Sequence, residues 1–281
     1  MGEHDTPQHA VINNRYMARI ITVCNNKGGV GKTTTAVSLG AALRLRGFDV
    51  LLIDYDGQAN ATDALRVPTD GGTTYDAMKR RTTPYIQPAR VLPAEGGAGV
   101  LDVLPSVFDL SALEIELSNQ SDRVTRFSTV ADKYRDKYDV VIVDTPPTLG
   151  LLTISALYAT DEIIITVQPQ YLAVKGLLTL ADAIETVSGN RGEEIDTVVL
   201  FTQYDRRKGL HRLTVEQVEA ARYKTFATKI RDNVALGEAP AAGLDIFRYA
   251  PRSNGAQDYD ALTDEYLAAR KVRHLKHGYK K

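Results

Sequence analysis

The sequence predicts an α/β fold, in which a mostly parallel, twisted β-sheet carries helices on both faces within a single domain. Short apolar runs alternate with stretches of helical periodicity, which is the pattern of βαβ units. The apolar runs are rich in Val, Ile and Leu, so we expect strands that are buried on both faces. A chain of 281 residues that is 43% hydrophobic and 25% charged suits one large domain of this class.

The pattern places the elements in order along the chain. The predicted strands are residues 20–25, 50–54, 100–104, 140–144, 162–167, 197–202 and 225–230. The predicted helices are residues 32–46, 73–79, 110–118, 123–134, 151–158, 174–188, 214–223 and 255–272. The segment 68–99 is rich in Gly, Pro and Thr, and we expect it to be the least regular part.

A glycine-rich loop joins the first predicted strand to the first predicted helix. Residues 24–35 read CNNKGGVGKTTT, and a second lysine, Lys27, stands five residues before Lys32. The usual G-x-x-x-x-G-K-[ST] pattern lacks its first glycine here. Glycines let successive backbone N–H groups turn onto phosphate oxygens, and the helix N-terminus adds partial positive charge.

We therefore predict a P-loop that binds a nucleotide together with Mg²⁺. Lys32 is expected to reach the β- and γ-phosphates, and Thr33 to give its hydroxyl to Mg²⁺. The predicted phosphate-binding residues are Lys27, Gly28, Gly29, Val30, Gly31, Lys32, Thr33 and Thr34.

Two further strands end in an acid. The apolar run 140–144 closes with Asp144, a Walker B pattern, and this carboxylate is predicted to hold Mg²⁺ opposite Thr33. The run 50–54 closes with Asp54, followed by Asp56. A carboxylate beside the phosphates orients or deprotonates a water, whereas an Asp at a strand end also commonly caps the next turn. Both interpretations of Asp54 stay open.

These motifs together resemble the ParA/MinD family of dimerising ATPases, with its deviant Walker A loop. The segments 54–62 and 233–256 also resemble that family, and the likeness runs from about residue 18 to residue 267. It implies that Lys27 crosses a dimer interface to the partner's nucleotide, although a solvated loop lysine is the alternative. It further implies that Lys27, Lys32 and Asp54 are the catalytic residues and that Asp54 contributes to the Mg²⁺ site.

Two departures from the family pattern stand beside these matches. Gly57 replaces the family's proline after the second acid. Asn233 is retained, but Arg231 and Asp232 replace its neighbours. The resemblance implies that Asn233 contacts the adenine, since its amide both donates and accepts, while a loop-capping role is nearly as good an explanation.

Charge is unevenly distributed. The net charge is −1, yet residues 204–231 sum to +5 and residues 270–281 carry six basic residues and no acidic ones. The family resemblance implies binding to DNA, and the predicted DNA-binding residues are Arg206, Arg207, Lys208, Arg212, Lys229 and Arg231, helped by the tail from Arg270. A solvated charged face is the alternative for any one of them.

Composition excludes several relatives. The single cysteine, Cys24, cannot bridge a cluster as in a nitrogenase-type iron protein, and it suits a reducing cytosol. The tail offers only Val272, Leu275 and Tyr279 to a bilayer, so no membrane partner is expected. The length leaves no room for the glutaminase domain of cobyrinate-type amide synthases.

The resemblance therefore implies a ParA-type partition ATPase, with residues 1–17 a disordered leader, 18–269 the ATPase domain and 270–281 a basic tail. The protein is expected to be cytoplasmic and nucleoid-associated, to form a homodimer with ATP and to bind double-stranded DNA non-specifically. A ParB-like activator is expected to stimulate its ATP hydrolysis. The alternatives are a MinD-like positioning ATPase on a membrane or protein scaffold, and a plain nucleotide-dependent ligase or kinase.

Overall fold

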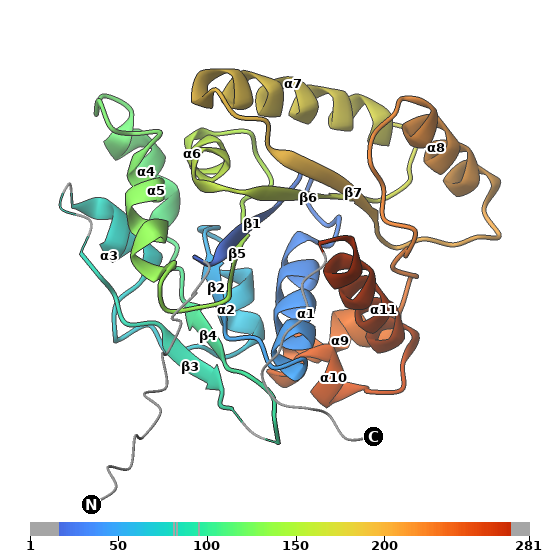
Figure 1. The fold of residues 1–281 in the computed structure, drawn as a ribbon, viewed down its shortest axis with the longest axis horizontal. Coiled ribbons are helices and arrows are strands. Elements are labelled where there is room, and N and C mark those ends of the chain that lie inside the picture. Colours follow the sequence, from blue (N-terminus) through green and yellow to red (C-terminus); the bar gives the residue numbers. More distant parts are fainter. Residues whose placement is uncertain (1–16, 81, 83, 95, 271–281) are drawn as a thin grey trace, which may run out of the picture.

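The computed structural model describes residues 17–80, 82, 84–94 and 96–270. Its centre is a sheet in the order β3-β4-β2-β5-β1-β6-β7 (Figure 1). Neighbouring strands are parallel except at the β3 edge, where β3 runs antiparallel to β4. The strands are β1 (Arg19–Cys24), β2 (Val50–Asp54), β3 (Ala89–Leu92), β4 (Leu101–Leu104), β5 (Val140–Asp144), β6 (Glu162–Val167) and β7 (Asp196–Phe201).

One face of the sheet is covered by the first and the last helices of the chain. These are α1 (Lys32–Leu45), α2 (Asn60–Ala64), α9 (Val234–Ala242), α10 (Ile246–Tyr249) and α11 (Asn254–Ala269). Ile21 and Val23 of β1 pack with Leu39 of α1 and Leu262 of α11 in one core cluster. In Figure 1, α1 and α11 lie side by side below the sheet, as their many contacts require.

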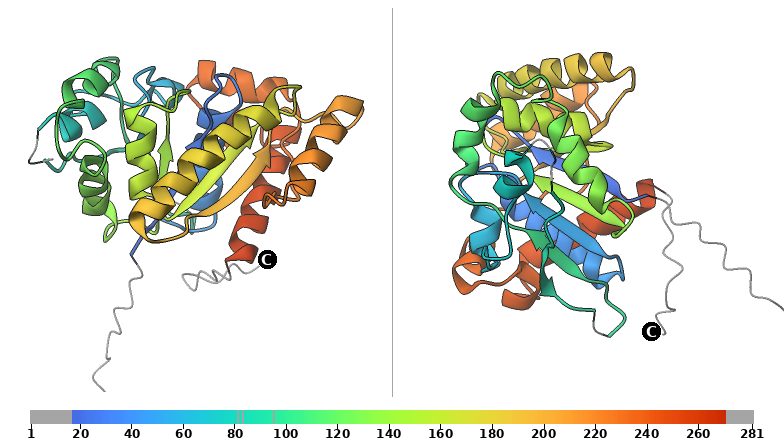
Figure 2. Two further views of the ribbon diagram at one scale, coloured as in Figure 1. Left: turned by 90° about the horizontal axis from the view of Figure 1, so that it is seen from above. Right: turned by 90° about the vertical axis from the view of Figure 1, so that its left-hand side faces the viewer.

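The other face is covered by the helices from the middle of the chain. These are α3 (Thr74–Lys79), α4 (Leu110–Leu117), α5 (Arg126–Ala131), the short η1 (Asp132–Tyr134), α6 (Leu151–Ala159), α7 (Ala173–Arg191) and α8 (Gly209–Ala220). Alternate strand residues such as Ile20 and Ile53 point into this layer. Figure 2 shows the sheet held between the two helical layers. The predicted fold class is confirmed.

The predicted strand 225–230 is wrong. Only isolated bridges join this part of the chain to the sheet, at Thr225 and Arg231. The amides of Ala227 and Thr228 instead donate to the Glu265 carboxylate of α11, at 2.6 and 2.8 Å. Consecutive residues of a strand point in opposite directions, so two neighbouring amides that share one carboxylate do not have strand geometry.

The remaining predicted boundaries mostly fall close to the structure, with clear exceptions. The predicted helix 123–134 splits into α5 and η1, and α8 begins at Gly209 instead of residue 214. The elements β3, α2, α9 and α10 were not predicted. The predicted leader and tail lie outside the described residues, apart from Met17 and Arg270.

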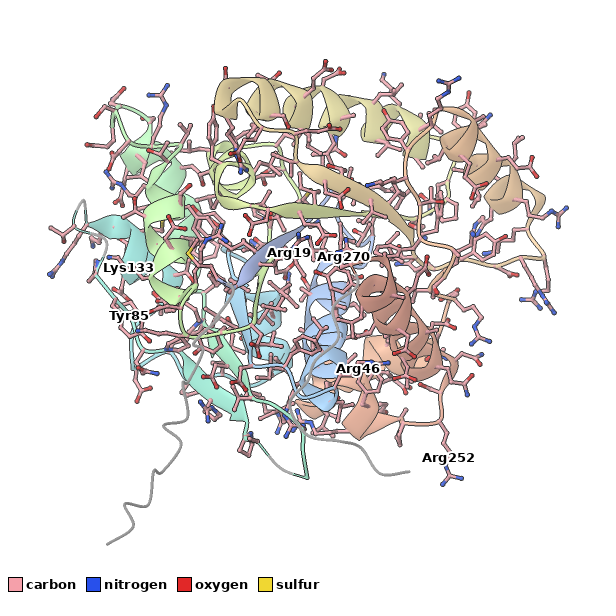
Figure 3. The ribbon with its side chains drawn as sticks, viewed as in Figure 1. Arg19, Arg46, Tyr85, Lys133, Arg252 and Arg270 are labelled. Atoms are coloured by element: carbon pink, nitrogen blue, oxygen red, sulfur yellow. The ribbon has the colours of Figure 1, made fainter. Side chains whose placement is uncertain are left out.

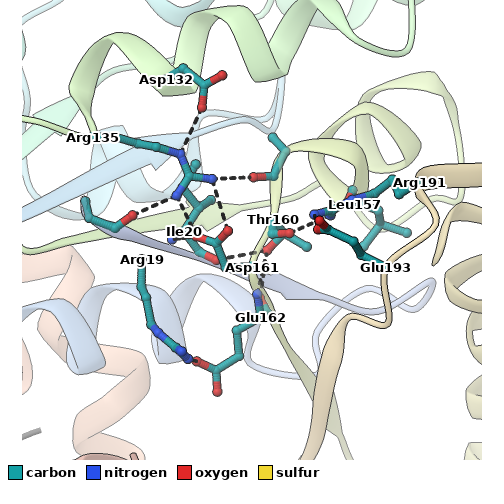
Figure 4. A network of polar contacts seen from close by, with 12 residues as sticks. Arg19, Ile20, Asp132, Arg135, Leu157, Thr160, Asp161, Glu162, Arg191 and Glu193 are labelled. Atoms are coloured by element: carbon teal, nitrogen blue, oxygen red, sulfur yellow. Dashed lines mark hydrogen bonds and ion pairs between the residues drawn. The ribbon is translucent and has the colours of Figure 1, made fainter. Parts of the chain in front are cut away.

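A polar network ties the amino-terminal end of β6 to its neighbours (Figure 4). Arg135 contacts Asp161 at 2.7 Å and Asp132 at 2.9 Å. Glu162 is fully buried and faces Arg19 at 3.7 Å. It also pairs with Arg270 at the end of α11. A buried carboxylate needs such cations to offset its lost hydration. The network anchors α11 at the amino-terminal end of the strands, opposite the glycine-rich loop.

Among the described residues, no helix is long and apolar enough to cross a membrane.

Candidate nucleotide-binding site

The glycine-rich loop lies at the carboxyl end of β1 and leads directly into α1. Gly29 and Gly31 have φ angles of 71° and 82°, in the left-handed region that favours glycine. Gly31 is the N-cap of α1, and no side chain caps the helix there. The first amides of α1 therefore remain available to an anion, which is the arrangement that binds phosphate.

A cavity of about 390 Å³ opens in front of this loop. At one end it is lined by the loop and α1, and at the other by α9, α10 and their connection. Leu236, Pro240 and Ile246 make the second end apolar. A polar cradle continuous with an apolar slot fits a nucleotide, whose phosphates and base demand those two environments. The predicted residues that line it are Gly28, Gly29, Gly31, Lys32, Thr33 and Thr34.

The two lysines of the loop face different surroundings. Lys32 is buried in the cavity wall, and its ammonium donates to the Lys27 carbonyl at 3.1 Å. Burial lowers the pKa of Lys32, while Asp144 and Asp56 act in the opposite direction. Lys27 is exposed and is not a lining residue; its ammonium donates to Gln170 Oε1 at 2.5 Å. Of the two loop lysines, only Lys32 therefore lines the cavity of its own chain.

Asp54 and Asp144 end adjacent strands and are paired in the sheet register. Both are fully buried, and neither lines the cavity directly. Burial raises the pKa of Asp54 to about 6 despite donors from Thr62. Burial raises the pKa of Asp144 well above its ordinary value, and the charge of the neighbouring Asp54 adds to the rise. Thr33 and Lys32 lower the pKa of Asp144 in part.

The Asp54 carboxylate accepts hydrogen bonds from a residue of α2. Its Oδ2 accepts from the Thr62 amide at 2.8 Å and from the Thr62 hydroxyl at 2.7 Å. Its Oδ1 accepts from the Asp56 amide at 3.3 Å, which is the turn-capping interaction that the sequence left open for Asp54. Asp56 is the acid of this strand end that lines the cavity. The catalytic role of Asp54 stays a prediction, and Asp56 has the more direct access to a bound phosphate.

The residues present fit Mg²⁺ held together with a nucleotide. Neither carboxylate oxygen of Asp144 has a hydrogen-bond partner, although both are buried. Among the described residues there is no group of three or more His, Cys, Asp or Glu that could hold a metal alone. Mg²⁺ characteristically takes one or two carboxylates and completes its shell with substrate phosphates and water. Asp144 and the Thr33 hydroxyl match that partial donor set.

Asn233 occupies the N-cap of α9 but makes no side-chain capping hydrogen bond. Its Oδ1 is buried without a partner, and it is not among the cavity-lining residues. Leu236, on the first turn of α9, does line the cavity. The adenine contact of Asn233 therefore stays a prediction.

The predicted DNA-binding residues gather around Tyr204, between β7 and the start of α8. The Tyr204–Arg231 bridge brings the segment 229–231 beside residues 206–212, and the Lys229 ammonium lies 5.9 Å from the Tyr204 ring. Arg207 is paired with Asp205 at 3.0 Å and Arg231 with Asp258 at 2.7 Å. Arg206, Lys208 and Arg212 are exposed. Two of the six charges are thus partly neutralised within the chain.

Several lining residues were not anticipated from the sequence. Gln203, Leu244, Asp245 and Ile246 belong to the cavity wall. Asp245 caps α10 through the Phe247 and Arg248 amides, at 3.0 and 3.1 Å. The left-handed Gly243 that ends α9 is the one local signal for this turn.

Comparison with known proteins agrees with this geometry. Residues 18–197 match the model of the AAA_31 family, described as an AAA domain. The sporulation initiation inhibitor protein Soj of Bacillus subtilis is 39% identical, covering 90% of this chain and 99% of that protein. The chromosome partitioning protein ParA of Caulobacter vibrioides is 36% identical, covering 92% of this chain and 97% of that protein.

One solved structure corrects an argument from length. The cobyrinic acid a,c-diamide synthase of Mycobacterium smegmatis, with bound ATP analog and magnesium, superimposes with a TM-score of 0.72 at 28% identity. The match covers 94% of this chain and 100% of that one. A cobyrinic acid a,c-diamide synthase can therefore have this size, and length alone does not exclude the class.

Proposed function

Since this chain belongs to the ParA/Soj family of P-loop ATPases, we propose that it is a partition ATPase that binds ATP and Mg²⁺, closes into a homodimer and then binds DNA non-specifically. Its cycle of binding and release segregates or positions a replicon. A ParB-like protein at a centromere site is the proposed activator of hydrolysis.

The observation that carries the dimer proposal is the opposite placement of the two loop lysines. Lys32 serves the chain's own cavity, whereas the Lys27 ammonium is turned outward to Gln170. A cation at the rim of the site is available to a nucleotide on a second copy. There it would neutralise negative charge that develops during phosphoryl transfer.

Three groups of the chain have assigned parts in this proposal. Gly29, Gly31 and the first turn of α1 bind the phosphates through their amides. Asp144 and Thr33 hold Mg²⁺, which supplies charge neutralisation at the phosphates when bound. Asp56, or Asp54 behind it, orients the attacking water.

The DNA surface is the basic cluster around Tyr204. Arg206, Lys208 and Arg212 are its exposed cations outside the Arg207–Asp205 and Arg231–Asp258 ion pairs, and a homodimer would present the cluster twice. If about six to ten phosphates are contacted, affinity should fall about 10³-fold or more between 50 and 200 mM salt.

Dimerisation is tested by light scattering with ADP and with ATP. We expect Lys27→Ala to bind nucleotide as a monomer and to lose the ATP-dependent dimer. Lys175→Ala removes an exposed lysine of nearby α7 and serves as the matched control, which should dimerise normally. A Lys27→Ala protein that dimerises like Lys175→Ala would rule out the role in trans.

DNA binding is tested by a gel shift with plasmid DNA in ATP, in ADP and without nucleotide. Arg206→Glu with Arg212→Glu should weaken the ATP-dependent shift. The control reverses Arg123 and Lys133 on the α5 side, and Figure 3 shows Lys133 at the opposite end of the molecule from α8. If the dimer forms but ignores DNA at low salt, a positioning ATPase on a protein scaffold or membrane becomes the better proposal.

A further inference from the structure

Two residues that follow β7 contact backbone carbonyls of the glycine-rich loop. The Thr202 hydroxyl donates to the Val30 carbonyl at 2.8 Å. The Gln203 amide donates through Nε2 to the Gly29 carbonyl at 2.7 Å. Thr202 is buried and lies against Gly31, where an added Cβ would meet its side chain at 3.5 Å. Consecutive peptide units of the loop are therefore each held from one side.

These bonds set the direction of the loop's amides. In a trans peptide unit the C=O and the following N–H point in opposite directions. Holding the Gly29 carbonyl toward Gln203 turns the Val30 N–H away from that side chain. Holding the Val30 carbonyl toward Thr202 does the same for the Gly31 N–H. A flipped peptide would instead present a carbonyl oxygen to an incoming phosphate, which would repel it.

Gln203 has an unusual backbone conformation. Its φ angle is 50°, which is uncommon for a residue with a side chain. A second amide secures it, because Gln168 Nε2, just beyond β6, donates to Gln203 Oε1 at 2.5 Å. Strained residues that surrounding contacts hold in place cluster at functional sites. The chain Gln168–Gln203–Gly29 links the ends of two strands to the loop.

We propose that Thr202 and Gln203 are positioning residues of the ATPase. They hold the Gly29 and Val30 carbonyls toward the end of β7, so that the loop amides are oriented for phosphate before the nucleotide arrives. Gln168 supports Gln203 in this role. The inference concerns nucleotide binding by one chain and does not depend on the dimer or on DNA.

The first test separates positioning from simple stability. Gln203→Gly removes the hydrogen bond to Gly29 and also relieves the left-handed strain. We expect its affinity for ADP and ATP, measured by calorimetry, to fall about tenfold. The melting temperature without nucleotide should stay unchanged or rise. The matched control is Arg222→Gly, because Arg222 has a φ of 65° one residue beyond the C-cap of α8 and does not line the cavity. It should change stability in the same direction and leave affinity untouched.

The second test uses the hydroxyl of Thr202. Thr202→Val keeps the shape but leaves the Val30 carbonyl without its donor, so the KM for ATP should rise about tenfold. Thr202→Ser restores the donor and should restore the KM.

Three results would each overturn the proposal. One is wild-type nucleotide affinity in both Gln203→Gly and Thr202→Val. Another is a serine variant as impaired as the valine variant. The third is a parallel loss of melting temperature and affinity in Gln203→Gly, which would assign this residue to folding alone.

Discussion

Replacing Gly57 with alanine should destabilise the protein, although alanine is a small residue and Gly57 lies in a loop. Gly57 is buried directly beneath the first turn of α4. A Cβ built there would lie 2.0 Å from Ser111 Oγ and 2.8 Å from the Ser111 backbone nitrogen. The hydroxyl can rotate away, but the nitrogen belongs to the backbone of α4. The helix itself must therefore move.

The size of the effect follows from that contact. Ordinary van der Waals contact begins at 3.4 Å, so α4 must shift by more than half an ångström at Ser111. Overpacking of this kind costs about 1–3 kcal/mol. We expect about 2 kcal/mol for Gly57→Ala, which lowers the melting temperature of a domain this size by about 4–8 °C. The family's proline at this position also carries a Cβ, so Gly57→Pro should destabilise the protein too.

Differential scanning calorimetry without nucleotide measures this. Gly189→Ala in α7 is the control, because its Cβ would meet nothing within 4 Å. Alanine there should stabilise the helix by about 0.5–1 kcal/mol. Adding Ser111→Gly to Gly57→Ala removes the closest contact and should recover part of the loss. If Gly57→Ala melts within about 1 °C of wild type, while Gly189→Ala behaves as expected, the packing argument fails.

The other predictions concern the charged groups of the site. Asp54 and Asp144 have raised pKa values in the folded protein, so the folded state binds more protons than the unfolded state. The contribution of these groups to stability without nucleotide should therefore be greatest below about pH 4 and should fall as the pH rises through about 6. Asp144→Asn should flatten this pH dependence of the melting temperature, and an unchanged slope would contradict it. Asp56→Asn should lower turnover about 10²-fold with little change in melting temperature, whereas an equal loss confined to Asp54→Asn would assign the water to Asp54 as the sequence predicts. Lys32→Ala should weaken ATP binding about 10²-fold in calorimetry, and near-normal affinity would show that its ammonium does not reach the phosphates.

Local pattern was enough to predict the frame of this molecule. The buried parallel strands appear in the sequence as unbroken apolar runs, because both of their faces meet helices. The loop at Lys27–Thr34 is also readable locally, since a strand, left-handed glycines and a helix N-terminus follow one another in the chain. Neighbouring residues determine these features, so no tertiary information is needed.

Only the tertiary structure decided which polar groups meet. The amides of Ala227 and Thr228 donate to Glu265, which is 38 and 37 residues away in the sequence. A local sequence pattern cannot reveal such a contact. The packing of α4 over Gly57 likewise joins segments far apart in the chain. The same is true of Gln203, which reaches Gly29 across 174 residues. Backbone propensity depends on residues that are close in the sequence, whereas these hydrogen bonds and steric contacts join groups that folding brings together. The detailed geometry of this site depends on such long-range contacts.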